Sequence, residues 1–402
     1  MPERRCAVTR VEDGTVRIAG PSAGPAFTRA VLDVAGAVLT WPALGPTGLP
    51  SAEIHDAGQA QQWLWAVYGE RVAAAVDAVA SGTPAAELTP PGRPTALAED
   101  AARLALGHWA ARWWPTSYLD GIPALEPDLL GLELAALANA CQQLLDEPAE
   151  LEGLELLEEH LDAVDPLIRW RQSADPPRRL DRVLRLIDDA ADRAGLDAEA
   201  LRRLRSALGQ DHRPAATPLD LAELFRRNQG FALAAGAPRT ANDRVVARGS
   251  GTNDWCRYPP GFVDAAENAV SWTAYAVGAD RRIEVEVVAD IAAPLSGVRL
   301  AAEVHVGGSP PNRFPLARRD DVWTGRANLD SPASTTPSME VGILLPGFDP
   351  GPGADDRAAR EAVRALARHR LGVATAPHDS EAAHPEPFLA EIAAAAAAEE
   401  DF

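Results

Sequence analysis

Residues 298–306 read Val-Arg-Leu-Ala-Ala-Glu-Val-His-Val, and this short stretch carries the clearest structural pattern in the chain. Every second side chain is apolar, whereas the positions between them include Arg299, Glu303 and His305. Because successive side chains of a β-strand point to opposite faces, the period of two predicts a strand with one buried and one polar face.

Four further stretches around this one also favour β-strands and are separated by turn-forming residues. They cover 269–277, 283–291, 322–329 and 339–345. Short strands joined by regular turns, with one polar face, are typical of an antiparallel β-sandwich. We therefore expect an immunoglobulin-like sandwich over residues 262–350. The Cys-Trp-Cys pattern of true immunoglobulin domains is absent, so this expectation concerns shape alone.

The region before the strands has the periodicity of α-helices. Its clearest example is an apolar stripe at helical spacing that ends at Gly195. The stripe consists of Leu180, Val183, Leu184, Ile187 and Ala191. Thr95 supplies an N-cap for an earlier helix, which Pro115 ends. The loops between these helices are short, so we expect an antiparallel helical bundle over 91–240.

The N-terminal residues mix the two periods. Asp13–Gly14 supplies the turn of a β-hairpin over 4–19. The alternating residues of its first strand are Ala7, Thr9 and Val11. Residues 26–39 are expected to form a helix and then a short strand, and residues 51–80 a helix. The Pro-, Gly- and Thr-rich residues 81–94 have the composition of a linker.

The C-terminal part follows the strands with an Arg-rich helix over 354–371. Residues 385–402 are Ala-rich, which predicts a low-complexity helical tail with frayed ends. The whole pattern is that of an α+β multidomain protein. Its expected segments are a small N-terminal α+β segment (1–90), a helical bundle (91–240), a β-sandwich (262–350) and a helical tail (351–402).

The composition excludes several functional classes. The chain has 402 residues, enough for two or three domains, and its net charge is -20. Such an acidic chain lacks the basic surface that nucleic acids and anionic membranes require. All 38 basic residues are Arg. Without lysine there is no Schiff-base, Walker-loop or kinase-type lysine chemistry.

The three cysteines, Cys6, Cys141 and Cys256, are far apart and odd in number, so they form no disulfide framework. They favour a reducing, cytoplasmic location. No signal peptide and no run of about 18 apolar residues is visible, so we expect no membrane span. We expect no cofactor.

One predicted helix carries a row of carboxylates, which raises the question of a metal site. The row consists of Glu152, Glu155, Glu159 and Asp162. Di-metal helical sites use a Glu-x-x-His motif, but the residue three positions before His160 is Leu157. A solvated acidic face is the better interpretation, and we expect no metal.

The sequence Gly20-Pro21-Ser22-Ala23-Gly24 matches the G-x-S-x-G nucleophile elbow of α/β-hydrolases. That fold places several strands before the motif, whereas only 19 residues precede this one. An ordinary loop between a strand and a helix is the better interpretation. Catalysis by Ser22 and anion binding at the helix N-terminus stay open as alternatives.

Aromatic residues gather in two stretches, 109–114 and 255–262. Aromatic side chains bury large areas and are enriched at protein interfaces, although packing in a core or between domains is the simpler role. The candidate binding residues are Trp109, Trp113, Trp114, Trp255, Tyr258 and Phe262.

Because no catalytic motif stands out, we expect a non-catalytic binding or adaptor protein that acts in a protein complex. The Arg-, Ala- and Pro-rich composition is similar in style to accessory proteins of actinobacterial defence or signalling gene clusters, a likeness that assigns no residue a role. One alternative is a serine hydrolase that uses Ser22. Another is a β-sandwich that binds carbohydrate or a small ligand through Trp272, Trp323 and His305.

Overall fold

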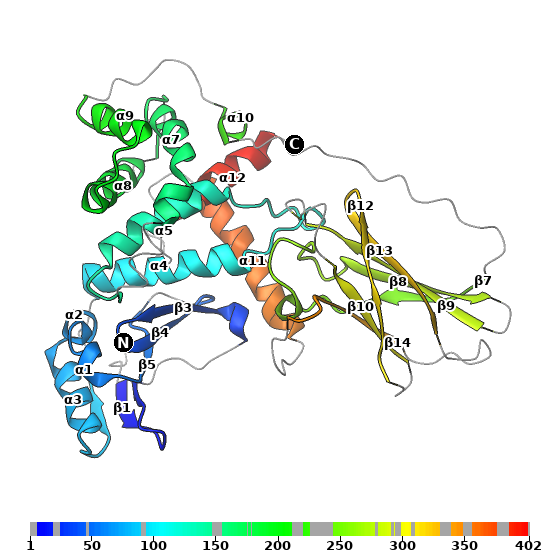
Figure 1. The fold of residues 1–402 in the computed structure, drawn as a ribbon, viewed down its shortest axis with the longest axis horizontal. Coiled ribbons are helices and arrows are strands. Elements are labelled where there is room, and N and C mark those ends of the chain that lie inside the picture. The colour runs from blue at the N-terminus through cyan, green and yellow to red at the C-terminus, as the bar shows by residue number, and fades with distance from the viewer. Residues whose placement is uncertain are drawn as a thin grey trace. The chain divides into compact units, whose positions relative to one another are not determined.

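A computed structural model describes most of the chain. The described residues are 6–18, 25–45, 48–89, 94–146, 155–174, 176–177, 179–210, 220–225, 244–277, 280–290, 293, 299–306, 310–329, 339–348, 356–375 and 386–400. They mix helices with antiparallel sheets, which confirms the α+β class (Figure 1).

Contacts divide the chain into two compact units. Unit 1 comprises Met1–Ala111, Leu125–Arg226 and His369–Phe402, and unit 2 comprises Arg112–Ala124 and Arg227–Arg368. Each unit is described by itself below. The finer division at 1–90, 91–240, 262–350 and 351–402 stays a prediction.

Unit 1 contains a six-stranded antiparallel sheet with the strand order β3-β4-β5-β2-β1-β6. Its strands are β1 (Cys6–Arg10), β2 (Val16–Ile18), β3 (Arg29–Val34), β4 (Ala37–Pro42), β5 (Ser51–Ile54) and β6 (Ala86–Leu88). The predicted hairpin is confirmed by the pairing of β1 with β2. Its buried face carries Val8, which is fully buried, whereas Ala7 and Thr9 are half-exposed.

Three other N-terminal predictions are wrong. Residues 26–39 form a short 3-10 turn (Ala26–Thr28), then β3 and the start of β4, and contain no α-helix. Residues 51–80 begin with β5 before the helices α1 (Ala57–Ala60), α2 (Leu64–Tyr68) and α3 (Glu70–Ala80). The expected linker contains β6, which pairs with β1. Pairing between strands decides each case, and a short apolar run does not reveal its pairing partner.

The helices of unit 1 follow their apolar stripes. They are α4 (Ala96–Trp113), α5 (Pro127–Ala140), α7 (Val164–Arg171), α8 (Leu180–Ala194), α9 (Glu199–Leu208), α10 (Leu221–Phe225), α11 (Arg357–Thr375) and α12 (Leu389–Glu400), of which α4 and α11 also contribute residues to unit 2. The predicted stripe of α8 is buried throughout, and Gly195 ends the helix in a left-handed conformation. No helix among the described residues is long and apolar enough to cross a membrane.

The C-terminal tail is helical, as predicted, but it is buried. Phe388, Leu389 and Ala390 are each 1% exposed or less, and Glu391 is fully buried. The residues at the start of α12 are bulky or charged and pack inside unit 1, whereas the fraying expected at the ends of the tail concerns residues outside those described.

Unit 2 contains two antiparallel sheets. The larger has the order β12-β13-β9-β8-β7 and the smaller the order β11-β10-β14. The strands are β7 (Arg244–Ser250), β8 (Val270–Val277), β9 (Asp280–Val288), β10 (Ala301–Val306), β11 (Asn312–Pro315), β12 (Ala317–Arg319), β13 (Val322–Leu329) and β14 (Met339–Leu344). All five predicted strands are present, whereas β7, β11 and β12 were not predicted.

The strand that opened the sequence analysis is β10. Ala302 and Val304 are fully buried and His305 is exposed, as the alternation predicts. Glu303, on the polar side, is only 6% exposed because neighbouring cations cover it. Residue 298 lies outside the described residues.

The turn between β3 and β4 depends on Gly36, and substituting this residue tests the fold of unit 1. Its φ is 76°, and an added Cβ would lie 2.4 Å from the Asp56 carbonyl oxygen. Gly195 provides a matched control, since its φ is 66° but nothing lies within 4 Å of an added Cβ. We expect Gly195→Ala to lower the free energy of unfolding by about 1 kcal/mol. Gly36→Ala adds an overpacking cost of about 1–3 kcal/mol. Equal losses in denaturant titrations would contradict this.

Candidate functional site

A tight turn in unit 2 combines a fixed backbone with an exposed aromatic side chain. It spans Ser117–Ile122, and we name it the Tyr118 turn. Ser117 and Ile122 exchange two main-chain hydrogen bonds of 2.9 and 2.8 Å. The Gly121 N–H donates to the Tyr118 carbonyl at 3.3 Å, and Gly121 has a φ of 65°, which favours glycine. The local sequence thus closes a two-residue tip, Leu119–Asp120, within the turn.

The buried carboxylate of Asp264 holds this turn from below. The Ser117 hydroxyl donates to Oδ1 at 2.7 Å, and the main-chain N–H groups of Tyr118 and Leu119 donate to Oδ2 at 2.7 and 3.3 Å. A fourth bond to Oδ1, from the Ala266 N–H, fixes the carboxylate within its own loop. Asp264 is 1% exposed, so these charge-assisted bonds are shielded from water.

Asp120 makes a second attachment, to the part of α11 that belongs to unit 2. Its N–H donates to the Ser117 hydroxyl at 2.9 Å. Its carboxylate lies 3.4 Å from Nε of Arg364 and 3.3 Å from Nη2 of Arg368. The turn is therefore tied to two segments that are distant in sequence.

Arg364 links this attachment to an ion-pair network. It is 2% exposed in its side chain and lies 3.1 Å from Glu267, which Arg360 also contacts through two bonds of 2.7 and 3.0 Å. Burial alone would raise the pKa of Glu267, but the bonds and charges of Arg360 and Arg364 outweigh it and lower that pKa. The network therefore stays charged at neutral pH and gives α11 a fixed register beneath the turn.

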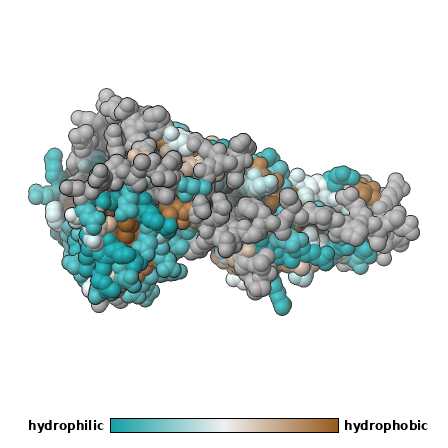
Figure 2. Space-filling model, turned by 90° about the horizontal axis from the view of Figure 1, so that it is seen from above, coloured by the Kyte–Doolittle hydropathy of each residue, from teal (hydrophilic) through white to brown (hydrophobic). Residues whose placement is uncertain are grey.

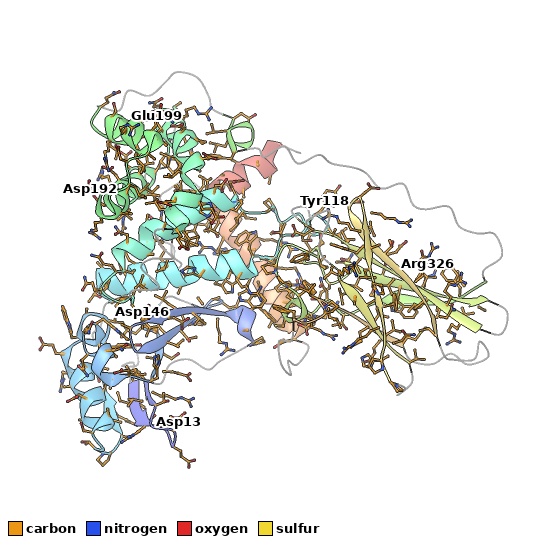
Figure 3. The ribbon with its side chains drawn as sticks, viewed as in Figure 1. Asp13, Tyr118, Asp146, Asp192, Glu199 and Arg326 are labelled. Atoms are coloured by element: carbon orange, nitrogen blue, oxygen red, sulfur yellow. The ribbon has the colours of Figure 1, made fainter. Side chains whose placement is uncertain are left out.

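Two neighbouring side chains of the Tyr118 turn face solvent. Tyr118 is 75% exposed and Leu119 is 44% exposed, two of the six large apolar or aromatic side chains that are exposed among the described residues. Figure 3 labels Tyr118 in the loop that carries it. In the view of Figure 2, hydrophobic areas are small and separated by hydrophilic ones. The Tyr118 turn therefore presents one aromatic and one aliphatic side chain to solvent on a fixed backbone.

The predicted binding residues lie mostly inside the protein. Trp109 of unit 1 is 3% exposed, and its indole N–H donates to the Phe27 carbonyl at 2.8 Å. In unit 2, Trp255 is 6% and Tyr258 3% exposed, and the Tyr258 hydroxyl donates to the Asn253 side chain. These contacts favour the packing role that the sequence analysis set beside binding.

Three further predicted residues lie close to the Tyr118 turn in sequence or structure. The Trp114 indole N–H donates to the Pro123 carbonyl at 2.9 Å and so closes the base of the loop. Trp113 is half-exposed, with the Arg112 guanidinium 4.6 Å from its ring centre. Phe262 is half-exposed and lies two residues before Asp264. Partner binding by Trp113 and Phe262 stays a prediction.

The sequence analysis missed Tyr118, Leu119 and Asp264. The only local signal was an Asp-Gly pair between Pro115 and Pro123, which is typical of a turn. The pairing of this turn with Asp264 left no trace in the spacing of residues, because 146 residues separate Tyr118 from Asp264.

Several other predicted residues add little to a site. Ser22 and Glu152 lie outside the described residues. Glu155, Glu159 and Asp162 are exposed, as a solvated acidic face requires. Across the described part of the chain, no three His, Cys, Asp or Glu side chains are grouped as metal ligands.

His305, proposed as a sugar-binding residue, belongs to an ion cluster on β10 and β11. Its Nε2 lies 3.2 Å from Glu303, which also meets Arg257 at 2.8 Å and Arg313 at 2.5 Å. Burial would raise the pKa of Glu303, but these three hydrogen-bonding partners lower it to about 2. The cluster stabilises the outer face of the three-stranded sheet.

No known protein family, curated protein or solved structure matches this chain.

Replacing Asp264 with alanine tests the support of the turn. Asp264→Ala removes the acceptor of four hydrogen bonds and leaves the Ser117 hydroxyl buried, so we expect unit 2 to lose about 3 kcal/mol of stability. Hydrogen exchange of the Tyr118 and Leu119 amides should rise in the folded state. Asp254→Ala is the control, since the Asp254 carboxylate accepts its bond from the Cys256 N–H, which lies outside the turn. Unchanged exchange in Asp264→Ala would contradict the assignment.

The Glu303 cluster has a defined pH response. The pKa of Glu303 in the folded protein, about 2, lies below the ordinary value of 4.5. The stabilising contribution of its carboxylate is therefore complete above pH 4.5 and is lost as the pH falls toward 2. We expect Glu303→Gln to cost about 2 kcal/mol at pH 7, reduced by water around the exposed Arg313. The difference from wild type should shrink in acid titrations. Glu340→Gln, at an exposed neighbouring position, is the control and should cost much less than Glu303→Gln at pH 7.

Proposed function

We propose that this chain is a non-catalytic binding or adaptor protein of a cytoplasmic protein complex, and that the Tyr118 turn meets its protein partner. The observation that carries the proposal is the exposure of Tyr118 and Leu119 on a backbone held by a buried carboxylate.

The physical argument starts from the cost of binding. Ordering a loop at an interface reduces affinity, so a loop that is already ordered by Asp264 keeps more of its contact energy. Tyrosine offers a rigid apolar ring with a polar end, and it is among the residues most enriched at binding hot spots. Leu119 adds apolar area next to it. A partner with an apolar pocket and a hydrogen-bonding group at its base would fit this tip.

The architecture proposed for the two units is consistent with such a role. For unit 2 we propose an immunoglobulin-like sandwich built from its two sheets, and for unit 1 an antiparallel helical bundle beside its sheet. Loops supported by a rigid scaffold carry function disproportionately often. A place among the accessory proteins of an actinobacterial defence or signalling cluster belongs to the same proposal.

The two alternatives have less support. Trp272 is 9% and Trp323 2% exposed, so neither ring offers an open face for stacking on a sugar. Ser22 lies outside the described residues, so catalysis by Ser22 stays an alternative prediction. Covalent labelling by a fluorophosphonate that is lost in Ser22→Ala would count against a non-catalytic role.

Site-specific crosslinking tests the proposal. A photoreactive phenylalanine analogue at position 118 of the full chain, expressed in its native host, should form one discrete adduct with a recurring protein. The same analogue at position 65 is the matched control, because Trp65 is also an exposed aromatic residue (54%) but lies in unit 1.

The partner recovered in this way then allows a quantitative measurement. We expect Tyr118→Ala with Leu119→Ala to weaken its binding by about 30-fold or more, as for a hot spot worth at least 2 kcal/mol. Trp65→Ala should leave the affinity unchanged. Crosslinks at 118 that are no more specific than those at 65, in a folded protein, would overturn the proposal.

A further inference from the structure

The C-terminal segment of the chain, Glu386–Glu400, is held in unit 1 in the manner of a bound peptide. Arg103 donates from Nη1 to the Glu386 carbonyl at 2.6 Å and from Nη2 to the Pro387 carbonyl at 3.2 Å. Two consecutive main-chain carbonyls are thus read by one guanidinium from α4. We call the residues of the body that contact this segment, Arg103, Glu133, Arg179 and Arg370, the acceptor surface.

Glu133 lies at the centre of the acceptor surface. It is 1% exposed and pairs with Arg103 at 2.7 Å and Arg179 at 2.5 Å. Its second oxygen accepts the Leu389 N–H, at the start of α12, at 3.0 Å. Burial would raise the pKa of Glu133, but the two Arg charges outweigh it and lower that pKa, so the carboxylate is charged when it caps the segment.

The segment contributes its own charged residue to the contact. Glu391 is fully buried and meets Arg370 through two parallel bonds of 2.5 and 2.6 Å. It also accepts the Phe388 N–H at 2.7 Å. The Phe388 ring centre lies 4.3 Å from the Arg103 guanidinium carbon and 5.7 Å from that of Arg370. Phe388 is therefore an aromatic anchor between two cations.

These contacts resemble a recognition interface more than an ordinary core. Buried ion pairs contribute little net stability, and their best-attested role is to select a register or a partner. Here the acceptor surface binds a short sequence, acidic-Pro-Phe-Leu-x-Glu, through contacts to its main chain, its aromatic ring and its carboxylate. Every group that reads it belongs to the body of unit 1, and none of these contacts requires the segment and the body to belong to the same molecule.

We propose that the acceptor surface also takes this segment from a second copy of the chain, so that two molecules exchange their C-terminal helices. Residues 376–385 join α11 to the segment, and a chain of this length spans up to about 35 Å. A segment from a second molecule makes the same contacts as the molecule's own segment. The closed and exchanged forms therefore differ mainly in which chain the segment is connected to, and a high protein concentration favours the exchanged form. This inference is independent of the Tyr118 turn, which lies in unit 2.

A pair of charge-reversal variants tests the exchange. Arg370→Glu and Glu391→Arg each place like charges together within one molecule. When the two full-length variants are mixed, exchange restores both contacts, because Arg370 of one variant meets Glu391 of the other and the two substituted residues meet with opposite charges. We expect each variant alone to be a monomer, and the mixture to give a 1:1 heterodimer by native mass spectrometry.

The wild-type chain supplies a second measurement if either variant fails to fold. Wild-type protein carrying two different tags is mixed at high concentration, and tag-heterodimers are counted over time. Phe388→Ala weakens the docking of the segment in the closed and exchanged forms alike, so it should speed the appearance of heterodimers at least tenfold, whereas Tyr118→Ala should leave their rate of appearance unchanged. Variants that stay separate when mixed, or wild-type chains that form no tag-heterodimer, would overturn the proposal.

Discussion

Pairing between arginine and carboxylate side chains away from water is the interaction on which both units depend. Glu133 meets Arg103 and Arg179, and Glu267 meets Arg360. Because the chain contains no lysine, every long cationic side chain has a planar guanidinium that can meet a carboxylate with two parallel bonds. A buried carboxylate that loses its arginine partner is left as an uncompensated charge. Each pair therefore fixes the relative position of the two elements that carry it, even where the pair adds little net stability. The fold tolerates few alternatives at these points.

The same constraint explains how a loop far from the strands becomes part of unit 2. Asp264 needs several donors once it is buried, and the Tyr118 turn supplies a hydroxyl and two main-chain N–H groups. Satisfying the carboxylate therefore also orders the turn. The entropy of that loop is lost during folding, when many contacts offset it, so less remains to be lost during association. Arg364 and Arg368 contribute in the same direction through Asp120.

The regular parts of this fold could be predicted from the sequence where one residue period extends over a whole element. β13 occupies the predicted residues 322–329, and the stripe of α8 is buried as expected. The predictions failed where an element is short and its partner decides its structure. Residues 26–39 are apolar without a strict period, so helix and strand were equally compatible, and pairing with β4 and β5 resolved the choice. β12 is only three residues long, which is too short for a residue period to show.

The candidate site was missed partly because Tyr118 and Asp264 are far apart in the sequence, and mainly because the burial of its side chains does not follow their polarity. Clustered aromatic residues in the sequence predicted a binding surface. Trp109 and Trp114 are buried instead, because main-chain carbonyls accept their indole N–H groups. At the Tyr118 turn the usual arrangement is inverted: the carboxylate of Asp264 is 1% exposed and the ring of Tyr118 is 75% exposed. Water hydrates an exposed ring poorly, so this inversion is unfavourable in the isolated chain. A partner that covers Tyr118 removes that cost while Asp264 keeps its bonds, which gives the inverted turn a physical reason to bind.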